Sequence, residues 1–267
     1  MTWNQLEAAV ADAEQYGTVG VAVIGPNGSA WSHNGQRKFK AASTVKIPLM
    51  IELFRRIDAG DMSLSDRHTL KADEKAPGSG VMLHLHDGVE LTLNDLIYLM
   101  ISISDNTATN LLIQKAGMDA VNATMQDLGM TNSNLGREMK NRAAQGDEME
   151  NWAAPDDYVA VVKSILDGEA ASAESCMAMR GMLQLQQNKR RISRYLPEDD
   201  GIEWGSKTGS IKDVANDVGY VRTAKGTLII AVFCENMPSQ PRGERMISDI
   251  TRAALLDTGV VDPLPVS

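Results

Sequence analysis

The sequence predicts an α+β fold in which one antiparallel five-stranded sheet, covered by the terminal helices, lies beside an all-helical lobe. Two observations predict it. β-Branched runs suited to strands gather near the two ends of the chain, and the long middle carries apolar residues at helical spacing. A length of 267 residues is enough for one large core. We therefore expect a single domain over 1–267, with an α/β lobe at 1–60 and 195–267 and a helical lobe at about 61–194.

The first elements are predicted to be a helix and a β-hairpin. Residues 3–15 place apolar side chains at the spacing of one helix face. The β-branched run 18–24 predicts a strand, the Pro-Asn-Gly sequence at 26–28 predicts a turn, and residues 29–33 predict a returning strand. A hairpin at this position supplies two neighbouring strands of the sheet.

The middle of the chain is predicted to be a series of helices joined by loops. Helices are expected over residues 43–59, 92–101, 106–116, 119–128, 155–167 and 172–187. Pro48 removes a backbone donor near the start of the first of these, which predicts an irregular beginning. The Gly- and Pro-rich stretch 71–88 and the unpatterned stretch 130–154 are expected to be loops. A loop as long as the second usually carries function.

The last part of the chain returns to β-structure. Strands are expected over residues 202–208, 216–222 and 227–234, and an amphipathic helix is expected over 243–257. The tight connections between these strands indicate antiparallel neighbours. With the early hairpin they complete the predicted five-stranded sheet, and the cleft between this sheet and the helical lobe is the natural place for a site.

Composition and charge exclude several classes of protein. The chain has 26 basic and 35 acidic residues and a net charge of −9, which argues against a nucleic-acid partner. One basic cluster stands out, and we expect it to be a solvated helix face. Its members are Lys189, Arg190, Arg191 and Arg194. No stretch is long and apolar enough to predict a membrane span, so we expect no membrane partner.

Further expectations concern metals and cofactors, the cellular compartment and the oligomeric state. Cys176 and Cys234 match no metal-ligand spacing and form no disulfide framework, so we expect no metal and no cofactor. The first residues lack the basic and apolar regions of a signal peptide. A cytoplasmic protein is expected if the chain is complete, and a periplasmic or secreted one if a leader was trimmed. We expect a monomer that acts on a small-molecule substrate.

The first chemical motif is Ser-x-x-Lys at 43–46. Residues three apart lie on one face of a helix, so Lys46 is expected to reach the hydroxyl of Ser43. A serine hydroxyl is a weak nucleophile until a base takes its proton, and a lysine serves as that base when burial or a neighbouring cation lowers its pKa. Taken alone, the motif equally describes two solvated helix residues.

Two further motifs follow in order. Ser-Asp-Asn at 104–106 comes after a predicted buried helix, and Lys-Thr-Gly at 207–209 lies on a predicted strand. Alone, the first is equally a helix cap and the second equally a strand end. All three motifs occur once and each stands in a distinct structural context. We expect the lobes to bring Lys207 near Lys46, where its charge would lower the pKa of the amine.

Together the motifs resemble the signature of class A β-lactamases and penicillin-binding proteins. The resemblance includes Ser-Asp-Asn-x-Ala-x-Asn-Leu-Leu at 104–112 and the Asn-Asp-Val sequence at 216–218, and it covers nearly the whole chain. It implies an α/β sandwich beside an all-α lobe, the β-lactamase/transpeptidase-like fold. It also implies hydrolysis of a cyclic amide through an acyl-enzyme.

The resemblance implies a role for each matching residue. Ser43 would be acylated, Lys46 would deprotonate it, and Ser104 would relay a proton to the leaving nitrogen. Asp105 would point inward and brace its loop, and Asn106 would bind the side-chain amide of the substrate.

The strand motif is implied to hold the other end of the substrate. Lys207 and Thr208 would bind its carboxylate, and Gly209 would keep the strand clear. The backbone N–H groups of Ser43 and Ser210 would form the oxyanion hole.

The long loop departs from the class A pattern. Glu138 stands about where the glutamate that activates the deacylating water is expected, but no Leu-Asn follows at the usual spacing. The segment also resembles the Arg-x-Met stretch of other β-lactamase-like hydrolases, in which this position need not be an acid. Glu138 is therefore either the deacylation base or a solvated carboxylate or partner of Arg137. Glu148 and Glu150 are the alternative carboxylates, or anchors of the loop.

The implied function is a serine β-lactamase. Two enzymes share the acylation step: a D-alanyl-D-alanine peptidase or penicillin-binding protein, and an ester or amide hydrolase of the same fold. The strand after Lys-Thr-Gly lacks a carboxylate-binding arginine near 215–216, which favours the last of these. A non-catalytic sensor domain is the rival from another class. Such sensors are normally tethered by a membrane helix, for which the sequence gives no signal.

Overall fold

The computed structural model describes residues 1–198 and 201–261. Helices are α1 (Asn4–Ala13), α2 (Lys46–Asp58), α3 (Leu93–Ser102), α4 (Asn106–Ala116), α5 (Met118–Asp127), α6 (Pro155–Asp167), α7 (Ala173–Gln184) and α8 (Gln240–Thr258). Strands are β1 (Thr18–Ile24), β2 (Ala30–His33), β3 (Phe39–Lys40), β4 (Arg67–Thr69), β5 (Glu90–Thr92), β6 (Trp152–Ala153), β7 (Glu203–Ile211), β8 (Val214–Thr223) and β9 (Gly226–Glu235). Within the described ranges, no helix has the length and apolar character needed to cross a bilayer.

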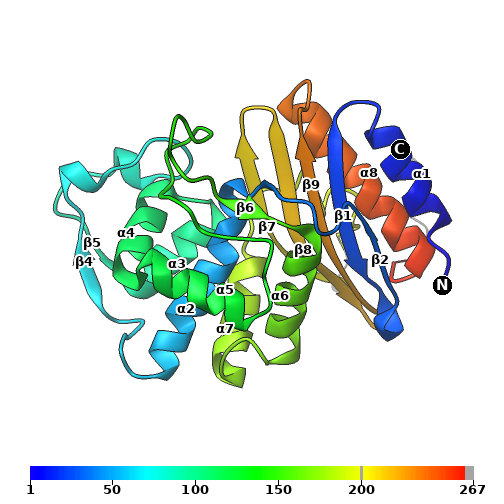
Figure 1. Ribbon diagram of the computed structural model, residues 1–267. Coiled ribbons are helices and arrows are strands. Elements are labelled where there is room, and N and C mark those ends of the chain that lie inside the picture. Colours follow the sequence, from blue (N-terminus) through cyan, green and yellow to red (C-terminus); the bar gives the residue numbers. More distant parts are fainter. Residues whose placement is uncertain (199–200, 262–267) are drawn as a thin grey trace.

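The main sheet has the order β2-β1-β9-β8-β7, and all of its strand pairs are antiparallel. The predicted five-stranded antiparallel sheet is therefore confirmed. The terminal helices α1 and α8 cover one face, and the helical lobe lies on the other side (Figure 1). Strand β7 is an edge strand, and it carries the Lys-Thr-Gly motif to the border of the helical lobe.

The central strands are buried on both faces because each face has its own helical cover. Side chains of a strand alternate between faces, so Val21 and Val23 join the core under α1 and α8 while Ala22 joins the larger core of the helical lobe. Strand β9 follows the same rule, with Val232 on the first side and Phe233 on the second. This double burial explains why these strands carry continuous apolar runs.

Helix α2 starts irregularly, as the sequence predicts. A 3₁₀ turn, Ala42–Val45, leads into it, and Pro48 is its third residue, where a backbone donor would have no partner inside α2. The helix contacts α3, α4, α5 and α7, and it is buried from Lys46 to Phe54. It thus packs within the helical lobe although it precedes residue 60. The division of the chain into lobes at that residue stays a prediction.

Strands β7 and β8 approach closely at Gly219, and this approach leads to a prediction about stability. A Cβ added to Gly219 would lie 2.2 Å from the carbonyl oxygen of Gly205 and 2.6 Å from Cβ of Ser206. Because the first clash is with backbone, the sheet itself must shift. We expect Gly219→Ala to lower the free energy of unfolding by about 3 kcal/mol, measured by urea denaturation.

A second glycine gives the matched control. In α7, a Cβ on Gly181 would meet nothing within 4 Å. Alanine is the better helix former, so Gly181→Ala is expected to raise the free energy of unfolding by roughly 0.5–1 kcal/mol. If the two substitutions changed the free energy of unfolding equally, the close approach of the strands at Gly219 would not be the cause of the loss.

Candidate active site

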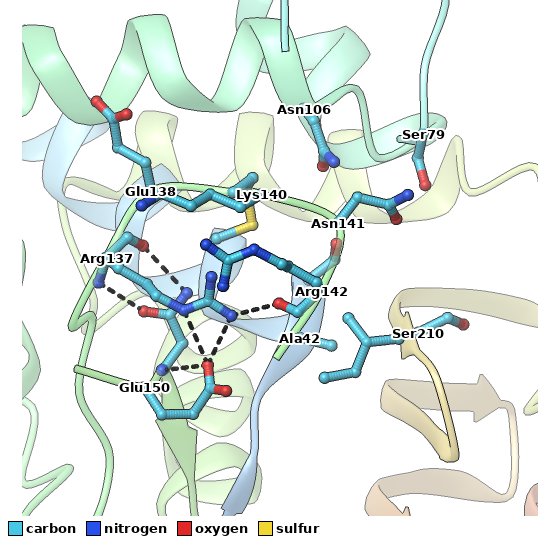
Figure 2. Close-up of a pocket in the computed structure, with 14 residues that line it drawn as sticks. Ala42, Ser79, Asn106, Arg137, Glu138, Lys140, Asn141, Arg142, Glu150 and Ser210 are labelled. Atoms are coloured by element: carbon cyan, nitrogen blue, oxygen red, sulfur yellow. Dashed lines mark hydrogen bonds and ion pairs between the residues drawn. The ribbon is translucent and has the colours of Figure 1, made fainter. Parts of the chain in front are cut away.

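Ser43 lies in the 3₁₀ turn before α2, at the border between the sheet and the helical lobe. It lines a cleft of about 590 Å³ together with Ser104 and Thr208. It also lines an adjoining pocket under the 137–151 segment of the long loop, shown in Figure 2. The preceding residue, Ala42, has a φ of 47°, a left-handed conformation that is rare for alanine. Backbone strain of this kind is typical of functional sites.

Lys46 is fully buried beneath this cleft. Its Nζ donates to the Ser104 carbonyl at 2.8 Å, contacts the Ser104 hydroxyl at 3.0 Å and donates to Oδ1 of Asn106 at 3.1 Å. Burial lowers the pKa of the Lys46 amine well below its ordinary value, and the charge of Lys207 lowers it further. The opposing influence of Asp105 is smaller. Lys46 is thus an amine whose neutral form is accessible, which is the property that a general base needs.

The Ser-Asp-Asn motif forms the turn between α3 and α4. Ser104 has a φ of 61°, the second strained residue of the site. Asp105 caps α4 by accepting from the N–H of Ala108 at 3.0 Å, and its other oxygen accepts from the N–H groups of Val81 and Met82 at 2.6 and 2.8 Å. The expectation that Asp105 braces its loop is confirmed. Asn106 Nδ2 donates to the carbonyl of Pro77 at 2.9 Å, so its amide is fixed from both ends.

The Lys-Thr-Gly motif lies on β7 directly beside the serine. A Cβ on Gly209 would lie 2.9 Å from the carbonyl oxygen of Ala41 and 3.2 Å from the backbone nitrogen of Ser43. Glycine therefore allows the strand to approach the Ser43 turn. Thr208 lines the cleft, and Lys207 is fully buried behind it with Nζ donating to the Thr208 carbonyl at 2.9 Å.

A buried charge cluster lies behind the strand. Burial lowers the pKa of Lys207 to about 7, and the charge of Arg191 lowers it further while that of Asp217 opposes the shift. Burial raises the pKa of Asp217 to about 6, and Arg191 opposes that shift. At neutral pH Lys207 is therefore only partly charged, although the resemblance implies that it binds the carboxylate of the substrate.

Arg191 is the residue that sequence reasoning missed. We predicted that its basic cluster is a solvated helix face. The cluster lies in the segment between α7 and β7 and not on a helix, and the expected exposure is wrong for Arg191. Its side chain is buried, and it donates to the carbonyls of Gly209 and Asn216 at 2.9 and 2.6 Å and to Oγ of Ser210 at 2.5 Å. It holds the end of β7 beside the cleft. No feature of a basic run distinguishes the one member that turns inward.

Glu138 is directed away from the serine. Figure 2 shows its side chain pointing away from Ala42 and Ser210. Its carboxylate accepts from Nε2 of Gln114 at 3.0 Å, and Gln114 lies roughly 12 Å along α4 from Asn106. The structure does not bring the Glu138 carboxylate to the other predicted catalytic groups.

The neighbouring residue takes the inward position. Met139 is 8% exposed and lines the pocket with Ser43. Its backbone is held by Asn110, which accepts from its N–H at 2.7 Å and donates to its carbonyl at 3.1 Å. Met139 therefore packs inward, whereas the Glu138 carboxylate lies at Gln114.

Two other loop carboxylates act as anchors, as one of the sequence alternatives expects. Glu150 accepts from Nη2 of Arg137 at 3.1 Å (Figure 2). It also accepts from the N–H of Ala144 at 2.8 Å. Glu148 accepts from Arg142 at 2.7 Å and from Lys140 at 2.6 Å. These ion pairs lower the pKa of Glu148 far below its ordinary value. The predicted pair between Arg137 and Glu138 is replaced by the pair between Arg137 and Glu150.

Comparison with known proteins agrees with this geometry. The model of the beta-lactamase enzyme family matches residues 2–258. The crystal structure of a beta-lactamase from Sphaerobacter thermophilus has a TM-score of 0.97 and 59% identity, covering 98% of this chain and 100% of that chain. The structure of PBP-A has a TM-score of 0.87 and 25% identity, with 97% of each chain covered. A mutant of PBP-A with the same scores is an acyl-enzyme complex with penicillin G.

Curated relatives are more distant. A beta-lactamase of Rhodobacter capsulatus is 34% identical over 151 residues, covering 55% of this chain and 51% of that protein, so the chain spans about half the length of that relative. Beta-lactamase VEB-1 of Pseudomonas aeruginosa is 24% identical over 251 residues, covering 88% of this chain and 83% of that protein. The family model and the full-length structural match lead to one conclusion: the chain belongs to the beta-lactamase enzyme family and has the class A-like fold.

Proposed function

We propose that the chain is a serine β-lactamase that opens the β-lactam ring through an acyl-enzyme on Ser43. The observation that carries this proposal is the state of the Lys46 amine beside the cleft that Ser43 lines. This amine is buried, it is hydrogen-bonded to Ser104 and Asn106, and its pKa is lowered. Membership of the family and the beta-lactamase name of its relative at 59% identity support it.

In the proposed acylation, neutral Lys46 takes the proton of Ser43 while Oγ attacks the ring carbonyl. The N–H groups of Ser43 and Ser210 bind the oxygen that becomes negative. When the ring C–N bond breaks, Ser104 gives its proton to the nitrogen and receives the proton held by Lys46. The amine is then neutral again, and Ser43 carries the acyl group.

Substrate binding is assigned to the remaining motif residues. Asn106 holds the side-chain amide of the substrate, since it faces the pocket on the loop side of Ser43. Thr208, which lines the cleft, holds the carboxylate on the other side, and the charged form of Lys207 attracts it from behind the strand. Gly209 has no side chain, so β7 can lie close to the turn that carries Ser43.

We assign activation of the deacylating water to Lys46 and not to Glu138. The Glu138 carboxylate accepts a hydrogen bond from Gln114, and the Glu150 carboxylate accepts one from Arg137. Lys46 leaves acylation as a neutral amine beside the ester. It accepts a proton from water as the hydroxide attacks the acyl carbon, and it returns that proton to Oγ of Ser43 when the ester C–O bond breaks.

A D-alanyl-D-alanine peptidase is the second candidate, favoured by one observation. Met139 takes the inward position on the loop, and a site without a loop carboxylate at that position is suited to slow release of the acyl group. Similarity to PBP-A, whose mutant forms an acyl-enzyme complex with penicillin G, points the same way.

Time-resolved intact-mass spectrometry with benzylpenicillin separates these functions. A β-lactamase gains the mass of one penicillin and then loses it while the ring-opened product accumulates. A peptidase keeps the adduct. Absence of any adduct while the penicillin stays intact would remove β-lactams as the substrate class.

The same experiment tests the place of Glu138. We expect Glu138→Gln to change the rate of adduct decay less than about 2-fold, because its carboxylate is bonded to Gln114 and is not a base for water. Gln114→Ala is the matched control, since it breaks the same contact from the other side. An adduct that persists only in Glu138→Gln would return the role of base to this residue.

A further inference from the structure

One wall of the cleft is formed by residues 186–190, between α7 and β7. It faces Ser43 and Thr208 across about 590 Å³. Gln186 and Asn188 contribute amides, Lys189 and Arg190 contribute positive charges, and no residue lining this part of the cleft is acidic. In a chain of net charge −9, a cationic wall beside the nucleophile is distinctive.

Hydrogen bonds attach residues 186–190 both to the helical lobe and to the sheet. The side-chain amide of Gln186 donates to the carbonyls of Ser206 on β7 and Ile101 on α3, at 3.3 and 3.5 Å. The N–H of Gln187 donates to the Ser102 carbonyl at 3.1 Å, and the carbonyl of Arg190 accepts from Ser248 at 3.1 Å. Anchoring at both ends holds the charges at the cleft, while the side chains of Lys189 and Arg190 stay exposed.

These two charges are poorly compensated by the protein. In the described part of the chain Lys189 has no ion-pair partner. Arg190 is 72% exposed at its side chain and reaches Glu244 only at 3.4 Å, and Glu244 is shared with Arg191 at 3.5 Å. One carboxylate therefore faces two guanidinium groups, and the wall keeps a net positive charge that is open to the cleft.

The wall also provides positive charge that Lys207, the buried lysine of β7, provides only in part. Lys207 stands behind Thr208, and burial lowers its pKa to about 7, so it is only partly charged at neutral pH. The strand after Lys-Thr-Gly has no arginine at 215–216, and the Arg191 guanidinium donates to the carbonyls of Gly209 and Asn216. Permanent positive charge for a substrate carboxylate must therefore come from elsewhere at the cleft.

We propose that Lys189 and Arg190 are specificity-determining residues that attract and hold the carboxylate of an anionic acyl substrate at the Thr208 side of the cleft. This inference rests on the proposed acylation of Ser43. With these two charges at the cleft, we expect a carboxylate-bearing cyclic amide to react faster than the neutral ester of the same compound. Because the side chains are exposed, their attraction acts on the encounter and weakens with salt.

A matched pair of substrates tests the proposal. The rate of acylation per substrate concentration is measured for benzylpenicillin and for its neutral methyl ester, with wild type and with Lys189→Gln/Arg190→Gln. We expect the double variant to lose about 10-fold with benzylpenicillin at low ionic strength and less than about 2-fold with the ester. The loss should shrink when salt is raised, since the screening length falls to about 3 Å at 1 M.

A charge-matched control is available on another surface. Lys163 on α6 and Lys115 at the end of α4 line pockets that exclude Ser43, so Lys163→Gln/Lys115→Gln removes the same charge away from the cleft. Equal losses for acid and ester, or an equal loss in this control, would overturn the proposal. Failure of wild type to acylate with either substrate would instead overturn the proposed function itself.

Discussion

Replacement of Ser43 by alanine is expected to abolish formation of the penicillin adduct and to lower the hydrolysis rate by at least about 10⁴-fold. Oγ of Ser43 is the atom to which the acyl group is attached in the proposed mechanism. The remaining groups of the site can bind and polarise the substrate, but they have no covalent step to accelerate. Intact-mass spectrometry and product formation measure the two effects separately.

Stability distinguishes this loss from unfolding. In the described residues, the Ser43 hydroxyl makes no hydrogen bond, in contrast to Thr44, whose hydroxyl donates to the Ala41 carbonyl at 2.8 Å. Ser43→Ala should therefore keep the wild-type free energy of unfolding within about 0.5 kcal/mol. A folded Ser43→Ala protein that hydrolyses penicillin at the wild-type rate would reject the whole scheme.

Lys46→Gln is expected to slow acylation by about 10³-fold, since general-base catalysis contributes factors of this order. The amide of glutamine can still donate to Ser104 and Asn106 but cannot take a proton from Ser43. The substitution also removes a fully buried cation whose pKa is depressed by burial, so it should not lower the free energy of unfolding.

The pH profile shows whether Lys46 acts as the base. Only neutral Lys46 accepts a proton, so the wild-type rate should rise as pH rises through the lowered pKa of Lys46. The charged form of Lys207 contributes to carboxylate binding, so the rate should fall as pH rises through about 7. Lys46→Gln is expected to lose the rising limb and keep the falling one. A rising limb that survives in this variant would assign the base to another group.

Much of the fold follows from local patterns. Runs such as 227–234 predict strands because a strand covered on both faces must be apolar at every position. At the start of α3, Thr92 Oγ1 accepts from the N–H of Asp95 at 3.1 Å and Asp95 accepts from the N–H of Thr92 at 2.8 Å. Such contacts connect residues three apart, so they can be recognised from the sequence.

The architecture and the three polar motifs can be predicted from the sequence, because each depends on near neighbours along the chain. Which charged side chains face the cleft depends on contacts between residues that are far apart in the sequence. Met139 faces inward and Glu138 outward because of a contact with Asn110 on α4, 29 residues away. Arg191 is buried while Arg190 is exposed because the carbonyls of Gly209 and Asn216 lie behind the wall. Neighbouring residues of like type differ only through distant partners, which no local pattern records.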